Sequence, residues 1–353
     1  MKIRCSPCLV VWGLAGGLLV LSLFVSLMRA PDSAPEGKEE QASPRGNSAP
    51  LAPILRRAFG FTEATPHLVP WDEIHEGCPR RDCIPALDEP RFVPADEAGF
   101  LGDGDAVLAL ALGGEAKAYP LKILNWHELV NDTVGKKPVL ISYCPLCGSG
   151  VAFERRVEGK TAEFGVSGLL YRSDLVMYDR ATNTLWSQIE GRAIAGPLSG
   201  KFLRTLPLAH TSWGEWKKHH PGTLVLSTDT GSASDYDRYP YGDYETNQEI
   251  FFPVAARDDR LPPKTAVYGV MVENTPIAYE AAWLREKGKL TDNVAGRELA
   301  VEVEEDGSVT VRDAGTGEAF TAMRLFWFAW YAFHPSTELR PEARPTAPAA
   351  PGP

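Results

Sequence analysis

The sequence lacks the motifs of several common enzyme classes. It contains no G-x-S-x-G, H-E-x-x-H or P-loop pattern, so nothing in it supports a serine hydrolase, a zincin metalloprotease or a P-loop nucleotidase. It also lacks a surplus of positive charge, because 36 Lys and Arg residues stand against 46 Asp and Glu residues, and 36 − 46 = −10. Nucleic acids and anionic lipid surfaces attract basic proteins, so this balance argues against a nucleic-acid partner.

The sequence shows no repeat with a fixed period. What it does contain is apolar residues, at 44% of the chain, with aromatic residues at 10%. Such a composition supports a packed core and excludes a wholly disordered chain. A length of 353 residues would allow two domains, although a single β-rich domain can reach about 250 residues, so the domain count is open from length alone.

Residues 9–28, LVVWGLAGGLLVLSLFVSLM, form an uncharged and mostly apolar run long enough to cross a membrane as one helix. Lys2 and Arg4 precede this run, and positive charge before a span predicts a cytoplasmic N-terminus, here residues 1–8. We therefore expect a single-pass signal anchor in the cell membrane, with the rest of the chain on the extracytoplasmic side, periplasmic or extracellular. A cleaved signal peptide is the alternative, although Met28-Arg29-Ala30-Pro31 is a poor cleavage site.

The remaining chain divides by composition into a linker, a folded part and a tail. Residues 29–53 are rich in Pro, Ser, Ala and charged residues and predict a flexible linker, and residues 336–353 predict a disordered Pro/Ala-rich tail. Between them, residues 54–335 predict one globular domain. Short apolar runs alternate there with turn residues, which indicates a β-rich α+β fold of many short antiparallel strands with a few short helices.

Several elements can be placed within that domain. Hairpins are expected around Gly113-Gly114, Glu158-Gly159-Lys160, Ala181-Thr182 and Asp306-Gly307. Asn125 predicts the start of a short helix that runs on to Val130, followed by a buried strand over 139–143. Residues 211–222 suggest an amphipathic helix with Trp213 and Trp216 inward, and 326–333 a core strand or a short buried helix. The loop 236–244, YDRYPYGDY, is interpreted as a surface loop pinned by its tyrosine rings.

The most specific local motif is Cys144-Pro145-Leu146-Cys147-Gly148. Two thiolates at this spacing can hold one tetrahedral metal ion, with Pro145 stiffening the turn and Gly148 allowing a positive φ. The same spacing also suits a redox dithiol or a structural disulfide, and these alternatives stay open.

Upstream of this motif, His127 lies before the strand that leads to Cys144, and a His with two Cys would make a three-ligand site open to a substrate. We therefore predict His127, Cys144 and Cys147 as ligands of a transition metal, which could be zinc, iron or copper. Glu128 and Asp174 are the candidate catalytic residues, with proton-transfer or supporting roles near the metal. The alternative for His127 is that it packs or caps beside the turn.

A second cysteine pair, Cys78 and Cys83, lies in a Pro-rich segment, GCPRRDCIPALDEP. In an exported protein such a short loop closes easily as a local disulfide. The alternative joins both pairs into a closed four-cysteine zinc site, which would make the metal structural.

The chain resembles a bacterial and archaeal family, the domain-of-unknown-function family 3179, over residues 75–335. The resemblance rests on AYPLKILNWHELVND, YCPLCGSGVAFERR, FGVSGLLYRSDLVMYDRATNTLWSQIEGRAI, VLSTDTG and FWFAWYAFHP. It implies no reaction. It implies that the typical blocks of the family contain His127, Glu128, Cys144, Cys147, Ser167, Asp174, Asp179 and Gln188. It also implies that the Cys78/Cys83 pair is an addition in this chain, which favours a local disulfide.

Three functions are compatible with these features. The first is a membrane-anchored, extracytoplasmic metalloprotein, and one form of this function is a metalloenzyme acting on a small molecule. The second is a thiol-disulfide redox protein that uses Cys144 and Cys147. The third is a non-catalytic cell-surface binding module in which both cysteine pairs are disulfides. The sequence names no protein partner.

Overall fold

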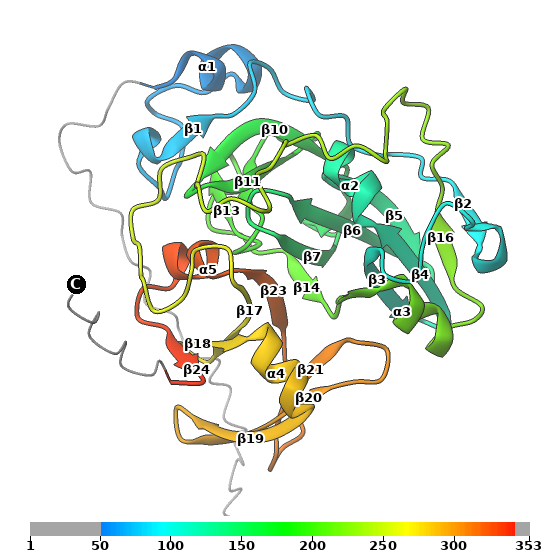
Figure 1. Ribbon diagram of the computed structural model, residues 1–353. Helices are drawn as coiled ribbons and strands as arrows, with labels where there is room; N and C mark the ends of the chain where they lie inside the picture. The colour runs from blue at the N-terminus through cyan, green and yellow to red at the C-terminus, as the bar shows by residue number, and fades with distance from the viewer. Residues whose placement is uncertain (1–50, 343–353) are drawn as a thin grey trace, which may run out of the picture. The chain divides into compact units, whose positions relative to one another are not determined.

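The computed structural model describes residues 51–342 (Figure 1). The predicted cytoplasmic segment 1–8, the predicted membrane span 9–28 and most of the predicted linker lie outside these residues. Within residues 51–342, no helix is both long enough and apolar enough to cross a membrane.

The described residues form a β-rich α+β fold, as the sequence predicts. The helices are α1 (Pro53–Phe59), α2 (Leu121–His127), α3 (Trp213–His219), α4 (Ala281–Lys287), α5 (Trp327–Phe333) and the 3-10 turns η1 (Trp71–Glu73) and η2 (Ala95–Glu97). The strands up to residue 206 are β1 (Ile74–Glu76), β2 (Phe92–Pro94), β3 (Ala106–Leu112), β4 (Glu115–Pro120), β5 (Leu129–Val134), β6 (Lys137–Cys144), β7 (Ser149–Glu154), β8 (Arg156–Val157), β9 (Lys160–Thr161), β10 (Phe164–Tyr171), β11 (Asp174–Asp179), β12 (Leu185–Ser187), β13 (Ala193–Ala195) and β14 (Arg204–Leu206). The later strands are β15 (Ala209–Ser212), β16 (Leu224–Leu226), β17 (Ala266–Val272), β18 (Thr275–Glu280), β19 (Lys289–Val294), β20 (Arg297–Val303), β21 (Val309–Asp313), β22 (Ala319–Phe320), β23 (Ala322–Phe326) and β24 (Glu338–Arg340).

Almost all neighbouring strands pair antiparallel, and two pairs, β4 with β16 and β18 with β24, are parallel. The larger sheets have the strand orders β1-β10-β11-β12-β13, β14-β7-β6-β5, β15-β3-β4-β16-β2, β23-β17-β18-β24 and β19-β20-β21-β22. The largest apolar core joins the sheet around β10 and β11 to the turn after β6 and to helix α5. The two cysteines of the candidate site therefore belong to the largest apolar core of the described chain.

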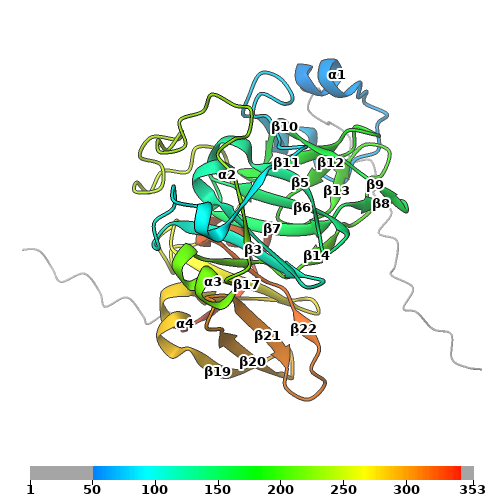
Figure 2. The same cartoon turned by 90° about the vertical axis from the view of Figure 1, so that its right-hand side faces the viewer.

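Two parts of the chain share one structure. β3, β4, α2 and β5 have the same order and lengths as β17, β18, α4 and β19, and every boundary is shifted equally, as 266 − 106 = 160 shows. Further along, α3 and β16 correspond to α5 and β24 with a smaller shift, 327 − 213 = 114. We call residues 106–154 with 209–226 the first copy, and residues 266–313 with 322–340 the second copy. The second copy is the yellow-to-red part of Figure 2.

The copies also share internal hydrogen bonds. Each contains W-x2-W-x3-H-P-x-T, at 213–223 and 327–337, and in each the indole of the second Trp donates to the final Thr. These bonds run from Trp216 to Thr223 at 3.0 Å and from Trp330 to Thr337 at 2.8 Å. A tyrosine-to-aspartate bond is shared as well, from Tyr119 to Asp132 at 2.7 Å and from Tyr279 to Asp292 at 3.2 Å.

The sequence has no repeat with a fixed period, yet the structure contains two copies of one arrangement, which the sequence analysis did not anticipate. The shift between the copies falls from 160 to 114 because residues 155–208, which join the two parts of the first copy, carry an extra sheet, β10 to β13. The two parts of the second copy are joined by residues 314–321, which contain only β22. A search for one period cannot detect a repeat that is interrupted in this way. Most paired positions also keep only apolar character, since packing needs shape and volume rather than one residue type.

The two copies contact each other through corresponding residues. Arg324 occupies in the second copy the place that His210 occupies in the first, and the two side chains approach to 3.3 Å. The backbone N–H of Phe326 in the second copy donates to the carbonyl of Cys147 in the first, at 2.8 Å. Contact between equivalent positions is the mark of a two-fold relation. The copies therefore pack as an internal pseudo-dimer.

The other predicted elements are largely confirmed. Hairpins form at Gly113-Gly114 and Asp306-Gly307, the strand over 139–143 is part of β6, and α3 buries both tryptophans. The segment 326–333 is mostly the short buried helix α5. The helix predicted to begin at Asn125 is wrong, because α2 runs from Leu121 to His127 and Asn125 lies inside it. Residues 338–340, which the sequence analysis assigns to the tail, form β24 and pair with β18.

The shared Trp–Thr bond leads to a matched prediction. We expect Thr223→Val and Thr337→Val each to lower the free energy of unfolding by about 1–3 kcal/mol, because each leaves a buried indole N–H without its acceptor. Equilibrium urea denaturation of the full-length protein would measure both. A loss of stability in only one of the two variants would mean that the two bonds do not have the same structural role.

Candidate metal centre and adjoining cavity

The Cys144–Cys147 segment is a tight turn between β6 and β7. The N–H of Cys147 donates to the carbonyl of Cys144 at 3.1 Å, which closes a β-turn with Pro145 at the position that favours its fixed φ. Gly148 follows with φ of 58°, and a Cβ on it would lie 2.9 Å from the ring of Phe326. Only glycine meets both conditions, so Gly148 lets the turn pack against the second copy.

Asp174 is positioned by a second tight turn. Arg172 and Ser173 connect β10 to β11, and both have a positive φ, of 52° and 67°. Two-residue hairpins of this kind normally use glycine or asparagine, so this turn holds a less common and more strained backbone. The carbonyl of Ser173 accepts a hydrogen bond from the thiol of Cys147 at 3.3 Å. The turn therefore brings the first residue of β11 to the cysteines.

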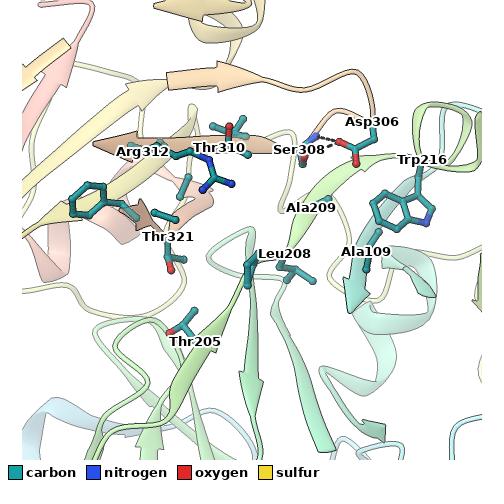
Figure 3. A pocket seen from close by; sticks show the side chains of 17 residues that line it. Ala109, Thr205, Leu208, Ala209, Trp216, Asp306, Ser308, Thr310, Arg312 and Thr321 are labelled. Atoms are coloured by element: carbon teal, nitrogen blue, oxygen red, sulfur yellow. Dashed lines mark hydrogen bonds between the residues drawn. The ribbon is translucent and has the colours of Figure 1, made fainter. Parts of the chain in front are cut away.

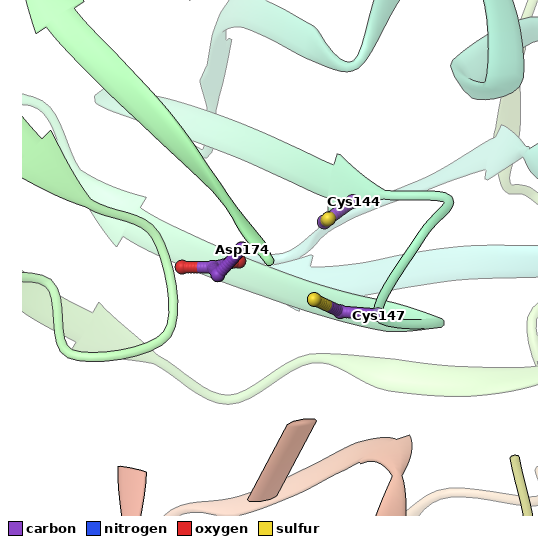
Figure 4. A group of neighbouring side chains, drawn as sticks. All are labelled: Cys144, Cys147 and Asp174. Carbon is purple, nitrogen blue, oxygen red and sulfur yellow. The ribbon is translucent and has the colours of Figure 1, made fainter. Parts of the chain in front are cut away.

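The two turns bring Cys144, Cys147 and Asp174 together (Figure 4). Their ligand atoms lie within 4.8 Å of one another, and all three side chains are buried. Three ligands of one zinc ion would each lie about 2.0–2.3 Å from it, so they must be near neighbours, as these three side chains are. Among residues 51–342 this is the one such group of His, Cys, Asp or Glu side chains.

One oxygen of Asp174 is free to bind a ligand. Oδ2 accepts from the N–H of Ile189 at 3.0 Å, whereas Oδ1 is buried without a hydrogen-bond partner in the part of the chain that the structure describes. Burial raises the pKa of this carboxyl well above its ordinary value, and burial together with the neighbouring Cys144 raises that of the Cys147 thiol. A cation would compensate for both penalties, since an unpaired buried acceptor is costly.

Other buried polar residues that the family resemblance points to have structural roles. Ser167 donates to the carbonyl of Val176, Asp179 accepts from the indole of Trp186 at 3.1 Å, and the side-chain amide of Gln188 donates to Ser142 at 3.1 Å. The carboxyl of Asp179 also accepts two bonds from Thr182, both at 2.7 Å. These side chains are satisfied within the fold, which separates them from Asp174.

His127 is not part of the group. Its Nδ1 lies 2.7 Å from the carbonyl of Pro85, which can only accept, so Nδ1 carries the proton and donates. Its Nε2 lies 2.7 Å from the hydroxyl of Tyr236 and accepts from it. Burial lowers the pKa of His127, which favours this neutral form. The observed arrangement corresponds to the alternative in which His127 packs beside the site.

Glu128 lies directly after helix α2 in an apolar setting. Its side chain is 7% exposed, and its Oε1 accepts a hydrogen bond from the hydroxyl of Tyr241 at 2.9 Å. Burial raises the pKa of this carboxyl from 4.5 to about 7, an effect that the bond from Tyr241 only partly offsets. A carboxyl that is half protonated near neutral pH is suited to general acid-base catalysis.

The tyrosine loop contributes to the site, although the sequence analysis preferred a surface loop over one that lines a pocket. Its hydroxyls reach three site elements: Tyr236 contacts His127, Tyr241 donates to Glu128, and Tyr244 donates to the carbonyl of Leu146 at 3.0 Å. This loop belongs to the long segment 227–265 that joins the two copies, and it folds back over the first copy. The concentration of tyrosines, four in the nine residues 236–244, is the sequence signal that could have indicated this role.

A cavity of about 270 Å³ lies next to the Cys144–Cys147 turn and the β10–β11 hairpin, although none of the three candidate ligands lines it. Leu146, between the two cysteines, and Leu175, next to Asp174, both line it. The rest of the lining is mainly apolar and includes Glu128, Tyr241 and residues of β10, together with Phe251 and Phe252. The wall of the cavity thus contains the candidate acid-base residue together with the direct sequence neighbours of Cys147 and Asp174.

A larger cleft, of about 360 Å³, lies between the two copies (Figure 3). Thr205, Leu208 and Ala209 line one side of it, and Thr310 and Arg312 lie on strand β21 of the second copy. Neither cysteine nor Asp174 reaches this cleft. Its size alone does not make it the site, because it gathers no group of metal-ligating or unpaired buried side chains.

The Cys78/Cys83 pair forms a local disulfide, which confirms the prediction. Cys144 and Cys147 are both free thiols, so the four cysteines do not share one metal site. The disulfide loop packs on β10, where the backbone of Cys78 and Arg80 comes close to Gly168, and Cys78 lines the cavity. The disulfide therefore braces one wall of the cavity.

Fold and site together define a β-rich duplicated protein with a buried Cys2Asp group, formed where the first copy meets the extra sheet within residues 155–208. The chain belongs to the family described as "Protein of unknown function (DUF3179)", whose model matches residues 81–337. No curated protein and no solved structure matches the chain. Family membership confirms the resemblance and names no reaction.

Proposed function

We propose that this protein is a metalloenzyme that acts on a small molecule, with Cys144, Cys147 and Asp174 as the ligands of one transition-metal ion. The observation that carries the proposal is the approach of their three ligand atoms to within 4.8 Å of one another in a buried place. The unpartnered Oδ1 of Asp174 supports it. This ligand set replaces His127 of the sequence-based set with Asp174.

The mixture of two thiolates and one carboxylate suits zinc best, with iron and copper as the other ions that such ligands accept. Three protein ligands leave a fourth position for water or substrate, and a bound zinc ion there lowers the pKa of water to about 7. Glu128 would hold or release a proton at its carboxyl beside this centre. Tyr241 would orient that carboxyl through the bond to Oε1.

The proposed location follows from the N-terminal sequence. A single helix over residues 9–28 would anchor the protein in the cell membrane, with the site on the extracytoplasmic side. The Cys78–Cys83 disulfide is consistent with an oxidising compartment.

Elemental analysis of the full-length protein, purified in detergent without chelator, tests the metal. We expect one equivalent of metal in the wild type and a loss of at least ~90% of it in Cys144→Ser, because the variant removes one of three ligands. A Cys78→Ser/Cys83→Ser double variant is the matched control, since it removes the other cysteine pair and should keep the metal.

Two results would contradict the proposal. A metal-free wild type with a Cys144–Cys147 disulfide in peptide mapping would favour the thiol redox function. A metal-free wild type with both thiols free and unreactive would favour the binding module.

A further inference from the structure

We infer that the cavity beside Leu146 and Leu175 is the substrate site, and that it takes a small, mainly apolar and uncharged molecule whose one hydrogen-bonding group meets Glu128. The term substrate site rests on the proposed metalloenzyme function. Binding in the cavity can nevertheless be measured without the metal.

The size and lining of the cavity set the substrate class. An engineered cavity of about 150 Å³ binds benzene, so 270 Å³ accommodates a molecule of roughly ten non-hydrogen atoms. Leucine, valine, isoleucine and phenylalanine side chains form most of the wall. Among the lining residues, Glu128 is the one whose charge changes near neutral pH, because Cys78 is in a disulfide and burial raises the pKa of Tyr241 far above 10.

The backbone of Glu128 indicates that its side chain is required there. Glu128 ends helix α2 with φ of 57° and ψ of −36°, a conformation that costs a non-glycine residue about 1–3 kcal/mol. The second copy offers an internal comparison, because Gly288 ends α4 at the same place with φ of 67° and ψ of −49°. The fold at this position is thus satisfied by glycine, and the first copy carries a strained glutamate instead.

The surrounding bonds show that the two positions are equivalent. In the first copy the carbonyl of Glu128 accepts from the N–H of Tyr143 at 2.7 Å, and in the second the carbonyl of Gly288 accepts from Val303 at 2.7 Å. The carboxyl is the difference between them. Its Oε1 is bonded to Tyr241, and within residues 51–342 its Oε2 has no hydrogen-bond partner. Oε2 is therefore available to a ligand in the cavity.

An uncharged ligand fits this environment better than an ion. A carboxylate ligand would face the carboxyl of Glu128 with no Lys, Arg or His side chain in the lining, and a buried unpaired charge is costly. An ammonium ligand would lose its hydration in the apolar cavity and gain one ion pair with Glu128. The desolvation cost of a buried ion can exceed the attraction of one such pair. A hydroxyl or amide needs only the hydrogen bond that Oε2 can give or accept.

Three probes of similar size test this with the full-length protein: 4-fluorobenzyl alcohol, 4-fluorobenzoate and protonated 4-fluorobenzylamine. Ligand-observed fluorine NMR would report their dissociation constants. We expect the alcohol to bind at least ~10-fold more tightly than either ion. Glu128→Gly should weaken alcohol binding by about 10-fold through the lost hydrogen bond. Ile84→Trp should weaken it by at least as much, since Ile84 is only half-buried and a larger ring fills the cavity.

The Cys144→Ser variant separates the two proposals. It should still bind the alcohol, because Cys144 does not line the cavity. If this variant and the wild type both lack metal while the alcohol binds, the metal centre is wrong and the cavity site stands. Tighter binding of benzoate or benzylamine than of the alcohol would overturn the inference, and so would alcohol binding that neither Glu128→Gly nor Ile84→Trp weakens.

Discussion

Asp174→Asn should lose the metal while His127→Gln keeps it. Asparagine has nearly the shape of aspartate, but it offers a neutral amide in place of the carboxylate that would lie with two thiols in a buried group. Changes in residues that only support metal ligands already reduce affinity about 10- to 100-fold, so loss of a ligand should reduce it by at least ~100-fold. Competition with a chromogenic chelator would measure both affinities in the full-length protein.

The His127 variant is the matched control. Both ring nitrogens of His127 are hydrogen-bonded, to Pro85 and Tyr236, so its replacement should lower the unfolding temperature without changing the metal stoichiometry. The reverse outcome, with metal lost in His127→Gln and kept in Asp174→Asn, would restore the ligand set expected from the sequence. It would also require the imidazole to leave both hydrogen bonds when the metal binds.

Glu128→Gly should make the protein more stable at pH 8 and impair the site. Glycine removes a backbone strain of about 1–3 kcal/mol at φ of 57°. It also removes a buried carboxyl whose pKa is raised to about 7, so at pH 8 the fold no longer holds a buried carboxylate. The opposing costs are the lost bond from Tyr241 and the greater freedom of glycine in the unfolded chain, about 1 kcal/mol each. We expect a net gain of about 2 kcal/mol in urea denaturation.

The pH dependence of this effect has a definite sign. Because the folded pKa of Glu128 lies above the unfolded value of 4.5, the folded protein binds more protons between about pH 4.5 and 7. The stability of the wild type relative to Glu128→Gln should therefore be greatest below pH 4.5 and fall by about 3 kcal/mol as the pH rises through 7. Glu128→Gln isolates the charge, and its difference from Glu128→Gly measures the strain. Equal stability of these two variants at pH 8 would show that glycine has no advantage at this position.

The sequence alone determined the class of fold and part of the site. Alternation of apolar and polar residues around turn residues follows from the two-residue period of a strand, so hairpins such as the one at Asp306-Gly307 could be predicted locally. The turn at Cys144–Cys147 and the disulfide of Cys78 with Cys83 involve residues close in sequence, and spacing is enough to recognise them.

The repeat could not be read from the sequence for a different reason. The two copies keep hydrogen bonds and packing rather than residue identity, and the extra sheet within 155–208 breaks the period. The longest match in residue identity is W-x2-W-x3-H-P-x-T at 213–223 and 327–337, where Trp216 and Trp330 each need the same threonine acceptor.

The third proposed ligand and the cavity were decided by tertiary structure. Which acidic residue approaches Cys147 depends on how β10 and β11 pack against the turn after β6, and a strained two-residue hairpin at Arg172-Ser173 sets the result. His127 is closer to the cysteines in sequence than Asp174 is, but its ring bonds to Pro85 and Tyr236 and is not part of the group. Local spacing thus identified the two thiols, whereas long-range packing selected Asp174 as their partner and placed Glu128 in an apolar cavity beside them.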